Sequence, residues 1–393
     1  MKRYAISATL KSPVIIQQNR QSDTSLSLDF IPGSTLRGAL AAQYIREGGT
    51  PDETEFKSLF LNNPVRFTDL LPTNCAGMKS RPLPLSAVSC KRKPGFLKEG
   101  DEGKKINTTA HGVEDILCRR FANYLKPETI SDNTCRICGN DLKCISGFWS
   151  ENLEVPQLHK PTMIMHRHTG IDRSTGTASD KIFFITQSIA DHRMDEGSGE
   201  FKPQEFYGTL YLTAEQLDPL KKLIESNLFV GANRTSGSGE VKLSLTEANE
   251  DQDSFDILKW DTDFKRKVKA FASIDPPEGI YFSVMMNSHA ILTDRFLRPS
   301  FDLDLPFDGV APVLKMVKSQ KIRGWQSSWG LPKPDDIGIV TGSVFLFKYE
   351  GDDLDGLNKF LSDVVKSGIG FRQEEGFGQV SICNQLHTAQ EVI

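Results

Sequence analysis

The feature of this 393-residue chain that most constrains its fold is a glycine-rich segment that occurs twice. The first copy covers residues 230–241 and the second covers residues 369–380. Three glycines and the β-branched residue at each end match at one constant offset of 139 residues. In both copies a strand-like and then a helical segment come before the loop, and a strand-like segment follows it. A duplicated unit of this kind predicts two similar domains of the α+β class.

The predicted domain boundaries follow from the positions of the two units. Short strands interleaved with single helices are typical of a ferredoxin-like, RRM-like sheet. We therefore predict a first domain over residues 1–245 and a second over residues 246–393, with the acidic polar run at 247–253 as the linker. The cysteine-rich stretch at about 75–160 has little strand pattern and is predicted to be an insertion in the first domain. A hairpin is predicted to follow it at about 161–185.

Charge and hydropathy restrict where the protein can act. No apolar run approaches the roughly 20 residues that a membrane helix needs, and the N-terminus has no signal-peptide core, so we expect a cytoplasmic protein without membrane contact. The formal net charge is -4. A nucleic-acid site must therefore be local, or be completed by partner subunits.

The glycine loops do not fit the common nucleotide-binding motifs. They follow a helix and precede a strand, whereas in a dinucleotide fold the glycines open a helix. A P-loop would need Lys-Ser or Lys-Thr after its last glycine, but Glu240 and Gln379 stand there. Spaced glycines let another backbone approach closely, which suits a sugar-phosphate chain with Arg234 and Arg372 beside it. A tight turn without a ligand is the alternative. The candidate glycines are Gly237, Gly239, Gly376 and Gly378.

Residues 166–177 combine arginines, histidines and hydroxyl groups with glycines that suggest a hairpin tip. Guanidinium groups can bind phosphate or stack on bases, and threonine hydroxyls can bond sugar or phosphate oxygens. The alternative is an exposed hairpin that binds nothing. The candidate residues are His166, Arg167, His168, Arg173 and Thr175.

Two further segments offer phosphate or base contacts. Ser34 or Thr35 can cap a helix that runs to about Arg46, and a helix N-terminus attracts anions. An ordinary helix cap is the alternative. Residues 321–329 form a basic and aromatic cluster, in which stacking on an unpaired base is typically worth about 1–3 kcal/mol. Core tryptophans beside solvated lysines are the alternative there. The candidate residues are Gly33, Ser34, Arg37, Arg323 and Trp325.

The cysteines indicate a metal site. Six of the seven lie between residues 75 and 160, and Cys135 and Cys138 have the spacing at which two thiolates share one tetrahedral Zn²⁺. We favour Cys90 and Cys118 as the other ligands, with His111 and Cys144 as alternatives. One structural zinc ion would hold together an insertion with few apolar residues. Free buried thiols are the alternative, and Cys383 is predicted to be a core residue.

Three motifs resemble one known family. Residues 31–38 resemble its segment I-P-G-S-S-L-R-G, residues 171–178 resemble I-D-R-x-T-G-x-A, and residues 376–380 resemble its C-terminal glycine-rich loop. The family is the RAMP superfamily of CRISPR systems, whose members are built from one or two RRM-like domains. The resemblance covers most of the chain outside the cysteine-rich stretch. It implies a subunit of a type III effector complex that binds the guide RNA (crRNA) together with other subunits.

Within that family, two domains plus a cysteine-bearing insertion look most like the type III-D subunit called Csx-ten. The resemblance implies a structural subunit that caps the 5′ handle of the crRNA and meets target RNA only indirectly, in antiviral defence. No catalytic residue is assigned. One alternative is a metal-independent endoribonuclease that processes guide RNA or cuts target RNA, with His166 and His168 as acid and base. The other is an interaction subunit that never touches RNA.

Overall fold

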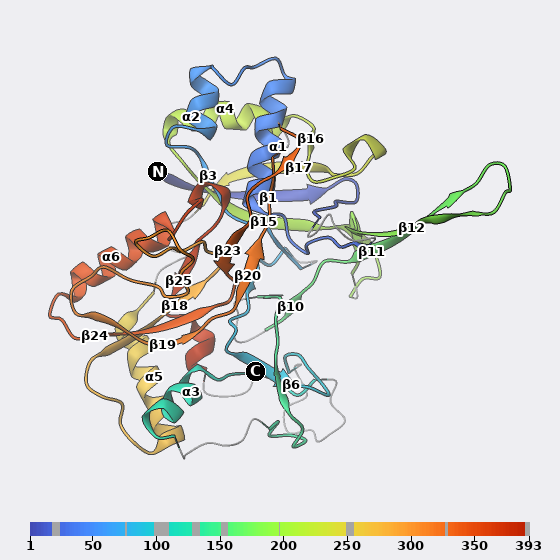
Figure 1. Cartoon of the computed structure of the whole chain (residues 1–393). Helices are drawn as coiled ribbons and strands as arrows, with labels where there is room; N and C mark the ends of the chain where they lie inside the picture. Colours follow the sequence, from blue (N-terminus) through green and yellow to red (C-terminus); the bar gives the residue numbers. More distant parts are fainter. Residues whose placement is uncertain are drawn as a thin grey trace.

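The protein has a mixed α+β fold, as predicted, and its two largest sheets are antiparallel (Figure 1). The coordinates are a computed structural model. The described residues are 1–17, 24–74, 77–97, 110–127, 134–150, 156–195, 197–248, 255–326 and 329–389, without the side chains of 24, 178–182 and 272. Most of the predicted linker, residues 249–253, lies outside the described residues. Within them, no helix is long and apolar enough to cross a membrane.

The first sheet and its helices form what we call the first half of the protein. The strand order is β16-β17-β1-β15-β3, with β4 also paired to β15. Alternate residues of β1 from Tyr4 to Leu10 are buried and pack against Leu36 and Leu40 of α1, the pattern of a sheet covered by helices on one face. The elements are β1 Lys2–Leu10, α1 Gly33–Arg46, α2 Thr54–Phe60, β3 Arg66–Phe67, β4 Leu71–Pro72, β15 Glu205–Leu212, α4 Ala214–Glu225, β16 Leu228–Phe229 and β17 Glu240–Glu247.

The start of α1 differs from the predicted cap. The helix ends at Arg46 as expected, but it begins at Gly33, after Pro32, and neither Ser34 nor Thr35 caps it. Instead the Gly33 N–H donates to the Oδ1 atom of Asp69 at 2.9 Å. A carboxylate that follows β3 therefore satisfies one of the unpaired amides at the helix start.

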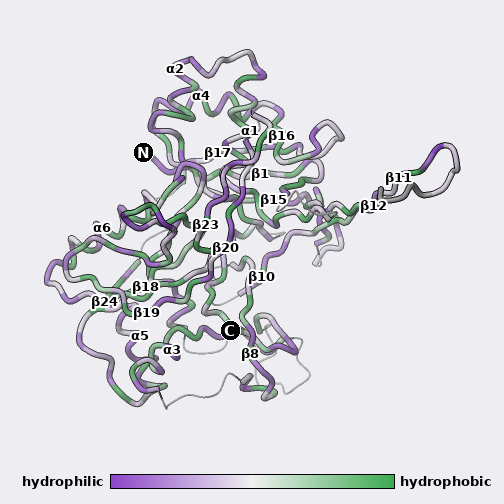
Figure 2. Tube along the Cα trace, viewed as in Figure 1, coloured by the Kyte–Doolittle hydropathy of each residue, from purple (hydrophilic) through white to green (hydrophobic). Residues whose placement is uncertain are grey.

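The second sheet belongs to the second half, residues 255–389, and has the order β19-β24-β18-β25. Its core includes Phe282 and Phe347, whose rings stack on adjacent strands. Figure 2 shows hydrophobic residues running along β18 and β24. The elements are α5 Ile257–Ala272, β18 Ile280–Met286, β19 Val310–Met316, β20 Ser319–Ile322, β21 Trp325–Gln326, β22 Leu331–Pro332, β23 Asp336–Ile339, β24 Val344–Tyr349, α6 Leu354–Ser367, β25 Val380–Ile382 and η4 Gln385–Thr388.

The duplicated sequence unit is also a duplicated structure. The pairs β15 and β24, α4 and α6, and β17 and β25 each begin 139 or 140 residues apart. The short helices of the two glycine loops, η1 Arg234–Ser236 and η3 Gln373–Glu375, begin 139 residues apart. The loops also bond alike, because Ala232 N–H donates to the Ile15 carbonyl at 2.8 Å and Phe371 N–H donates to the Ile291 carbonyl at 3.0 Å.

Most of the loop glycines that match at the 139-residue offset lie against the chain's own backbone. A Cβ on Gly239 would lie 2.2 Å from the Val230 carbonyl oxygen, and one on Gly378 would lie 1.8 Å from that of Ile369. A Cβ on Gly376 would lie 2.8 Å from the Phe67 carbonyl oxygen of the first half. At these three positions the backbone that approaches the glycine closely is the protein's own, whereas a nucleic-acid backbone was predicted there. Gly237 differs, because the space beside it is open.

This geometry predicts unequal effects for two neighbouring glycines. Both have positive φ, 83° at Gly237 and 93° at Gly239, so alanine costs about 1–2 kcal/mol at either position. Gly239→Ala adds the clash with Val230 and is expected to lower the free energy of unfolding by about 3 kcal/mol or more. Gly237→Ala is the matched control. Denaturant unfolding that gave equal losses for the two variants would contradict this account.

The cysteine-rich stretch lies in sequence between β4 and β15 of the first half but packs mainly on the second half. Helix α3 contributes Leu117 and Phe121 to the second core, where Phe121 packs against Phe264 of α5. A separate small core joins Trp149 to Leu386 of η4. The insertion therefore contacts the end of the chain, as Figure 1 shows. Its elements are β5 Arg81–Pro82, β6 Ala87–Cys90, β7 Val113–Asp115, α3 Leu117–Leu125, β8 Leu142–Cys144, β9 Phe148–Trp149 and β10 Leu158–His159.

A long hairpin extends away from the body of the protein (Figure 1). It consists of β11 Met163–Ile171 and β12 Ala178–Ile189, paired antiparallel, and its base is extended by β2 Thr24–Ser25. Met165, Ile171, Phe183 and Phe184 are exposed on it. The short strands β13 His192–Met194 and β14 Phe201–Pro203 lead back to the first sheet.

Candidate functional site

Four side chains of the insertion form a cluster suited to a metal ion. The ligand atoms of Cys90, His111, Cys135 and Cys138 all lie within 4.8 Å of one another. The Sγ atoms of Cys90 and Cys138 are 3.5 Å apart, whereas two sulfurs bound to one tetrahedral Zn²⁺ lie roughly 3.8 Å apart. The His111 Nε2 atom is buried without a hydrogen-bond partner. Three thiols and one imidazole at these distances fit a closed structural zinc site.

Local structure explains why these residues meet. Cys135 and Cys138 lie on one turn, closed by a hydrogen bond from the Gly139 N–H to the Cys135 carbonyl at 2.8 Å. Cys90 ends β6, which pairs with β8 just beyond that turn. The Asn140 side chain donates to Cys138 Sγ at 3.1 Å, and this contact lowers the pKa of Cys138 to about 6. A lowered pKa favours the thiolate, the form that binds metals.

The predicted ligand set is corrected at one position. Cys118 is not in the cluster, and His111, which the sequence left as an alternative, occupies the fourth corner. Cys118 lies on the buried face of α3, where its thiol contacts the His387 carbonyl at 3.3 Å. Burial raises the pKa of Cys118 to about 12, so it is a core thiol. Cys144 is exposed on β8 and also lies outside the cluster, and Cys383 is buried in the second core.

A groove of about 950 Å³ brings together several residues singled out from sequence. It lies between the two halves, and both glycine loops, the start of α1 and the β21–β22 hairpin contribute to it. Residues far apart in the chain therefore share one surface. The predicted residues that line the groove are Ser34, Arg234, Arg323, Trp325 and Arg372.

The cations of this groove are of two kinds. Lys333 and Arg372 are held by the buried carboxylate of Glu375, at 2.9 Å and 2.6 Å, and Arg372 also pairs with Asp336. In the part of the chain that the structure describes, Arg234 and Arg323 are exposed and have no ion pair. Exposed guanidinium groups without a protein carboxylate can bind an external phosphate. Lys333 was not singled out from sequence, because only the β21–β22 pairing carries it to the groove.

An aromatic side chain stands beside these cations. Trp325 is 39% exposed and lines the groove, and Trp329, on the turn that follows β21, is 77% exposed. Neither tryptophan is a core residue, which removes the alternative that was weighed from sequence. An exposed indole next to arginines is a suitable surface for stacking an unpaired base.

Other predicted residues lie elsewhere. Arg37 donates to the Phe60 carbonyl and ties α1 to the end of α2. Gly33 is buried, and a Cβ there would lie 2.5 Å from the Phe67 carbonyl oxygen. These two residues do not line the groove, and their contacts are with other parts of the protein.

The hairpin residues form a separate, exposed surface. His168 stacks on Phe184 with ring centroids 4.5 Å apart, and its Nε2 atom lies 2.9 Å from the Thr186 hydroxyl. His166 lies on the same side of the hairpin, with its ring centroid 6.4 Å from that of His168. All five hairpin residues that the sequence analysis proposed as RNA contacts are exposed. They are His166, Arg167, His168, Arg173 and Thr175.

Asp172 has a local structural role at the hairpin tip. Its Oδ1 atom accepts hydrogen bonds from the Ser174 N–H at 2.7 Å and the Ser174 hydroxyl at 2.6 Å. Among the described residues Asp172 forms no ion pair with an arginine. The carboxylate instead fixes a turn, as Asp commonly does.

Comparison with known proteins identifies the family. The family model of the RAMP superfamily matches residues 7–242. No curated protein sequence matches the chain. Among solved structures, the chain is similar to a subunit of the type III-B Cmr-beta complex bound to cognate target RNA and AMPPnP, with 13% identity over 91% of this chain and 93% of that one and a TM-score of 0.42.

Two further structural neighbours are known. One is in the Csm3-Csm4 subcomplex of the type III-A CRISPR-Cas interference complex, with 12% identity, coverage of 88% and 95%, and a TM-score of 0.35. The other is oligomeric Cmr4 from Pyrococcus furiosus, with 15% identity, coverage of 64% and 100%, and a TM-score of 0.25. Because the family match itself spans more than half of the sequence, the chain belongs to the RAMP superfamily.

Proposed function

We propose that this protein binds the guide RNA of a type III CRISPR effector complex as a structural subunit. The observation that carries the proposal is the groove in which Arg234, Arg323 and Trp325 meet. Membership of the RAMP superfamily supports RNA as the ligand. The two arginines would bind phosphates and the indole would stack on a base, so that the strand is held mainly by its backbone.

The remaining charges of the groove support a positioning role. Lys333 and Arg372 are fixed by Glu375, so these cations keep their places before any RNA arrives. Prearranged cations lose less side-chain freedom on binding. The net charge of -4 is then compatible with RNA binding, because several positive groups line one groove.

The finer assignment is also part of the proposal. We propose two tandem ferredoxin-like domains, residues 1–245 and 246–393, and a type III-D subunit of the Csx-ten kind that caps the 5′ handle of the crRNA. Four strands follow one another in the same order in both sheets, β17-β1-β15-β3 in the first and β25-β18-β24-β19 in the second. This shared order supports the tandem domains. The exposed hairpin of β11 and β12 would contact RNA or neighbouring subunits beyond the groove. One zinc ion would be held by Cys90, His111, Cys135 and Cys138.

Replacing Arg234 and Arg323 tests the groove directly. Arg234→Ala with Arg323→Ala is expected to weaken binding of crRNA by about tenfold or more at low salt, because two charge-assisted phosphate contacts are lost. The slope of log K against log salt should also fall by about 1.4, since each contact to a single strand contributes about 0.7. Filter binding or fluorescence anisotropy across a salt series measures both quantities.

The control is Lys221→Ala with Lys222→Ala, which removes two exposed charges from α4 outside the groove. It has the same effect on net charge and should leave both the affinity and the salt slope nearly unchanged. Equal losses in the two double variants would mean that net charge, and not the groove, determines RNA binding.

A further inference from the structure

The segment that leaves the first strand of each sheet is held by its glycine loop in the same way. The Gly239 N–H donates to the Pro13 carbonyl at 2.9 Å, and the Gly378 N–H donates to the His289 carbonyl at 2.8 Å. The chain that follows β1 and the chain that follows β18 therefore correspond through the duplication. Residues 15–17 of the first segment line the groove, so the second half carries a surface equivalent to part of the groove wall.

This equivalent surface contains an exposed aromatic residue. In the first glycine loop Ala232 lines the groove. Its counterpart in the second loop is Phe371, which is exposed and whose N–H makes the matching bond to the Ile291 carbonyl. Beyond Ile291 the chain turns back in a short hairpin whose tip, residues 294–298, is exposed. A phenylalanine in place of an alanine therefore lies at the base of this tip.

Hydrogen bonds to Asp294 fix the conformation of the tip. Its Oδ1 atom accepts from the Phe296 N–H at 2.8 Å and from the Arg298 N–H at 2.9 Å. Between them Leu297 is exposed and has a φ of 61°, in the left-handed region that is unfavourable for a leucine. Backbone strain of this kind persists only where the surrounding structure imposes it, and it is concentrated at ligand sites.

Two arginines of the tip share one aromatic ring. The Cζ atoms of Arg295 and Arg298 lie 4.7 Å and 5.1 Å from the centroid of the Phe296 ring, and all three residues are exposed. Within the residues that the structure describes, neither arginine forms an ion pair with a carboxylate. The carboxylate of Asp294 accepts from backbone N–H groups instead. Two like charges gathered at one exposed ring favour an external anion beside them.

We propose that residues 294–298, together with Phe371, form a second RNA-contact surface that takes a single-stranded segment of RNA. The guanidinium groups would bind phosphates, and the exposed rings would stack on unpaired bases. This inference rests on the proposed function, because the groove supplies RNA as the class of ligand. No residue of the tip lines the groove, so the contact is with a part of the strand that lies outside it.

Charge and duplication together favour RNA over a protein at this surface. A protein partner would have to bring carboxylates to the two arginines, whereas a single strand carries a phosphate at every nucleotide and bases that can stack. The corresponding segment of the first half lies in a groove with arginines and an exposed indole. The two halves would then offer similar chemistry to one strand.

Arg295→Ala with Arg298→Ala is expected to weaken binding of single-stranded RNA to the purified chain by about tenfold. The slope of log K against log salt should fall by about 1.4, and fluorescence anisotropy across a salt series measures both quantities. Arg295→Lys with Arg298→Lys keeps the charges but not the planar forks, so it should retain most of the salt slope and only part of the affinity. Photo-crosslinking of thiouridine-labelled RNA, followed by mass spectrometry, should find the peptide that carries Phe296.

Two controls separate this inference from the groove. Lys221→Ala with Lys222→Ala removes the same charge from exposed positions of α4 and should change neither quantity. The groove variant Arg234→Ala with Arg323→Ala should still crosslink at the tip.

A tip variant that binds RNA as the parent does, in a chain that shows no crosslink at the tip, would overturn this inference even where the groove variant loses affinity. A parent chain that binds no RNA would overturn the proposed function as well. Unchanged RNA affinity together with loss of a partner subunit from the purified complex would make the tip a protein contact, which also contradicts the proposal.

Discussion

Cys138→Ser is expected to remove the metal from the protein and to unfold the insertion around it. The parent chain should contain about one zinc per molecule, and the variant well under half of that. Structural zinc sites contribute roughly 10–16 kcal/mol of apparent binding free energy at neutral pH. Among the described residues, the insertion has a small core of its own around Trp149, so the loss of the metal should expose the segments that carry the ligands, residues 90–97 and 134–145, to proteases. Elemental analysis and limited proteolysis measure the two effects.

Cys144→Ser is the matched control for this prediction. Cys144 lies in the same insertion and is exposed outside the cluster. The substitution should leave the zinc content and the proteolysis pattern unchanged. A parent chain without zinc, or equal zinc loss in both variants, would mean that Cys90, His111, Cys135 and Cys138 do not form a metal site.

The metal site shows which ligands can be predicted from sequence spacing and which cannot. The pair Cys135 and Cys138 could be found from sequence, because a single turn brings them together. The other two ligands depend on the pairing of β6 with β7 and β8, which spacing does not reveal. Cys118 was chosen over His111, although Leu117, Phe121 and Ala122 around it already have the spacing of a buried helix face. Weighing that periodicity would have assigned Cys118 to the core.

The glycine loops show a different limit. Their equivalence followed from the constant offset, and the structure places them in equivalent positions after α4 and α6. What their glycines approach could not be read from sequence, because the partner carbonyls belong to distant residues such as Ile15 and Ile291. Close packing on the protein's own backbone and close packing on RNA require the same residue type.

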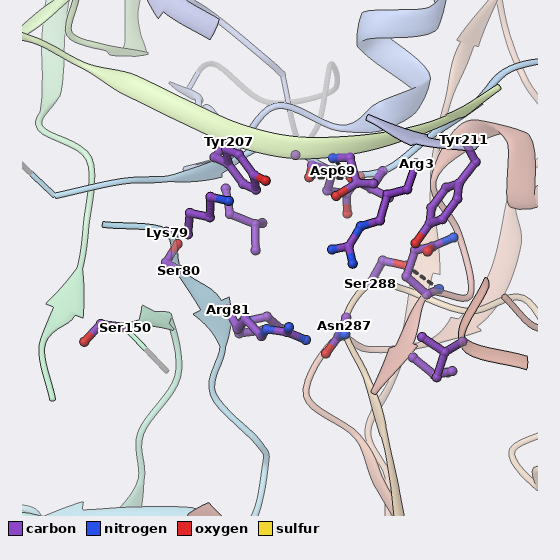
Figure 3. A pocket seen from close by; sticks show the side chains of 18 of the residues that line it. Arg3, Asp69, Lys79, Ser80, Arg81, Ser150, Tyr207, Tyr211, Asn287 and Ser288 are labelled. Atoms are coloured by element: carbon purple, nitrogen blue, oxygen red, sulfur yellow. Dashed lines mark hydrogen bonds between the residues drawn. The ribbon is translucent and has the colours of Figure 1, made fainter. Parts of the chain in front are cut away.

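A cavity of about 420 Å³ between β15 and the second half, with Arg3 and Arg81 among its lining residues, was not found from sequence at all (Figure 3). Alternation along β15, with Tyr207, Thr209 and Tyr211 on one face and buried apolar residues on the other, was the available signal. That pattern predicts a sheet face that is not covered by its own helices. It does not reveal that the second half and β5 close over this face, which is what turns it into a pocket.

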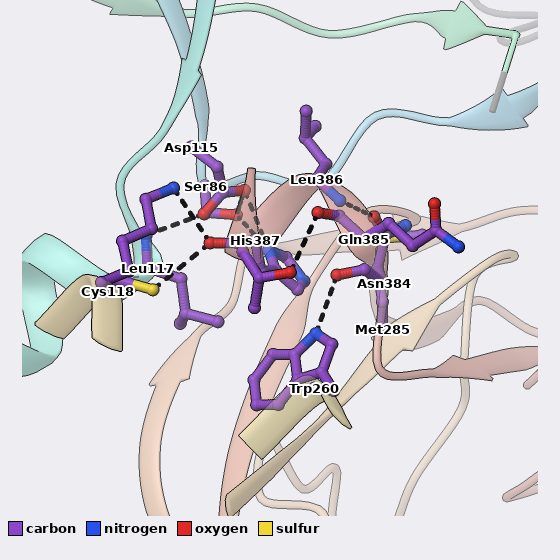
Figure 4. A network of polar contacts seen from close by, with 12 residues as sticks. Ser86, Asp115, Leu117, Cys118, Trp260, Met285, Asn384, Gln385, Leu386 and His387 are labelled. Carbon is purple, nitrogen blue, oxygen red and sulfur yellow. Dashed lines mark hydrogen bonds and ion pairs between the residues drawn. The ribbon is translucent and has the colours of Figure 1, made fainter. Parts of the chain in front are cut away.

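Asp115→Asn is expected to destabilise the whole protein by about 3–5 kcal/mol, the usual effect of removing one partner from a buried charged network and leaving the other groups unsatisfied. Asp115 accepts hydrogen bonds from the Ser86 hydroxyl at 2.5 Å and from the Leu117 N–H at 2.9 Å, and it pairs with His387 at 2.9 Å. Lys267, also buried, donates to the His387 carbonyl at 3.1 Å. Figure 4 shows this network, which joins the insertion to α5 and η4.

The control is Asp275→Asn, which removes an acid that also has a lysine partner. Asp275 pairs with Lys269 at 2.8 Å, but its side chain is 74% exposed. A solvent-exposed pair contributes about 0–1 kcal/mol, so this variant should unfold almost like the parent. Denaturant unfolding at neutral pH compares the two. Similar losses would mean that burial of the Asp115 network does not determine its contribution.

The same network gives a pH dependence with a definite sign. His387, Ser86 and Lys267 together hold the pKa of Asp115 at about 2, below its ordinary value of 3.8, despite the opposing effect of burial. A lowered pKa in the folded state stabilises the protein above about pH 4, and this contribution of roughly 2 kcal/mol is lost as the pH falls toward 2. The Asp115→Asn variant has no carboxylate at this position, so it cannot lose this contribution. The stability difference between parent and Asp115→Asn should therefore shrink between pH 4 and pH 2, and titrating groups that do not contact Asp115 cancel in the comparison. A difference that stayed constant over that range would show that the charge of Asp115 does not contribute to folding.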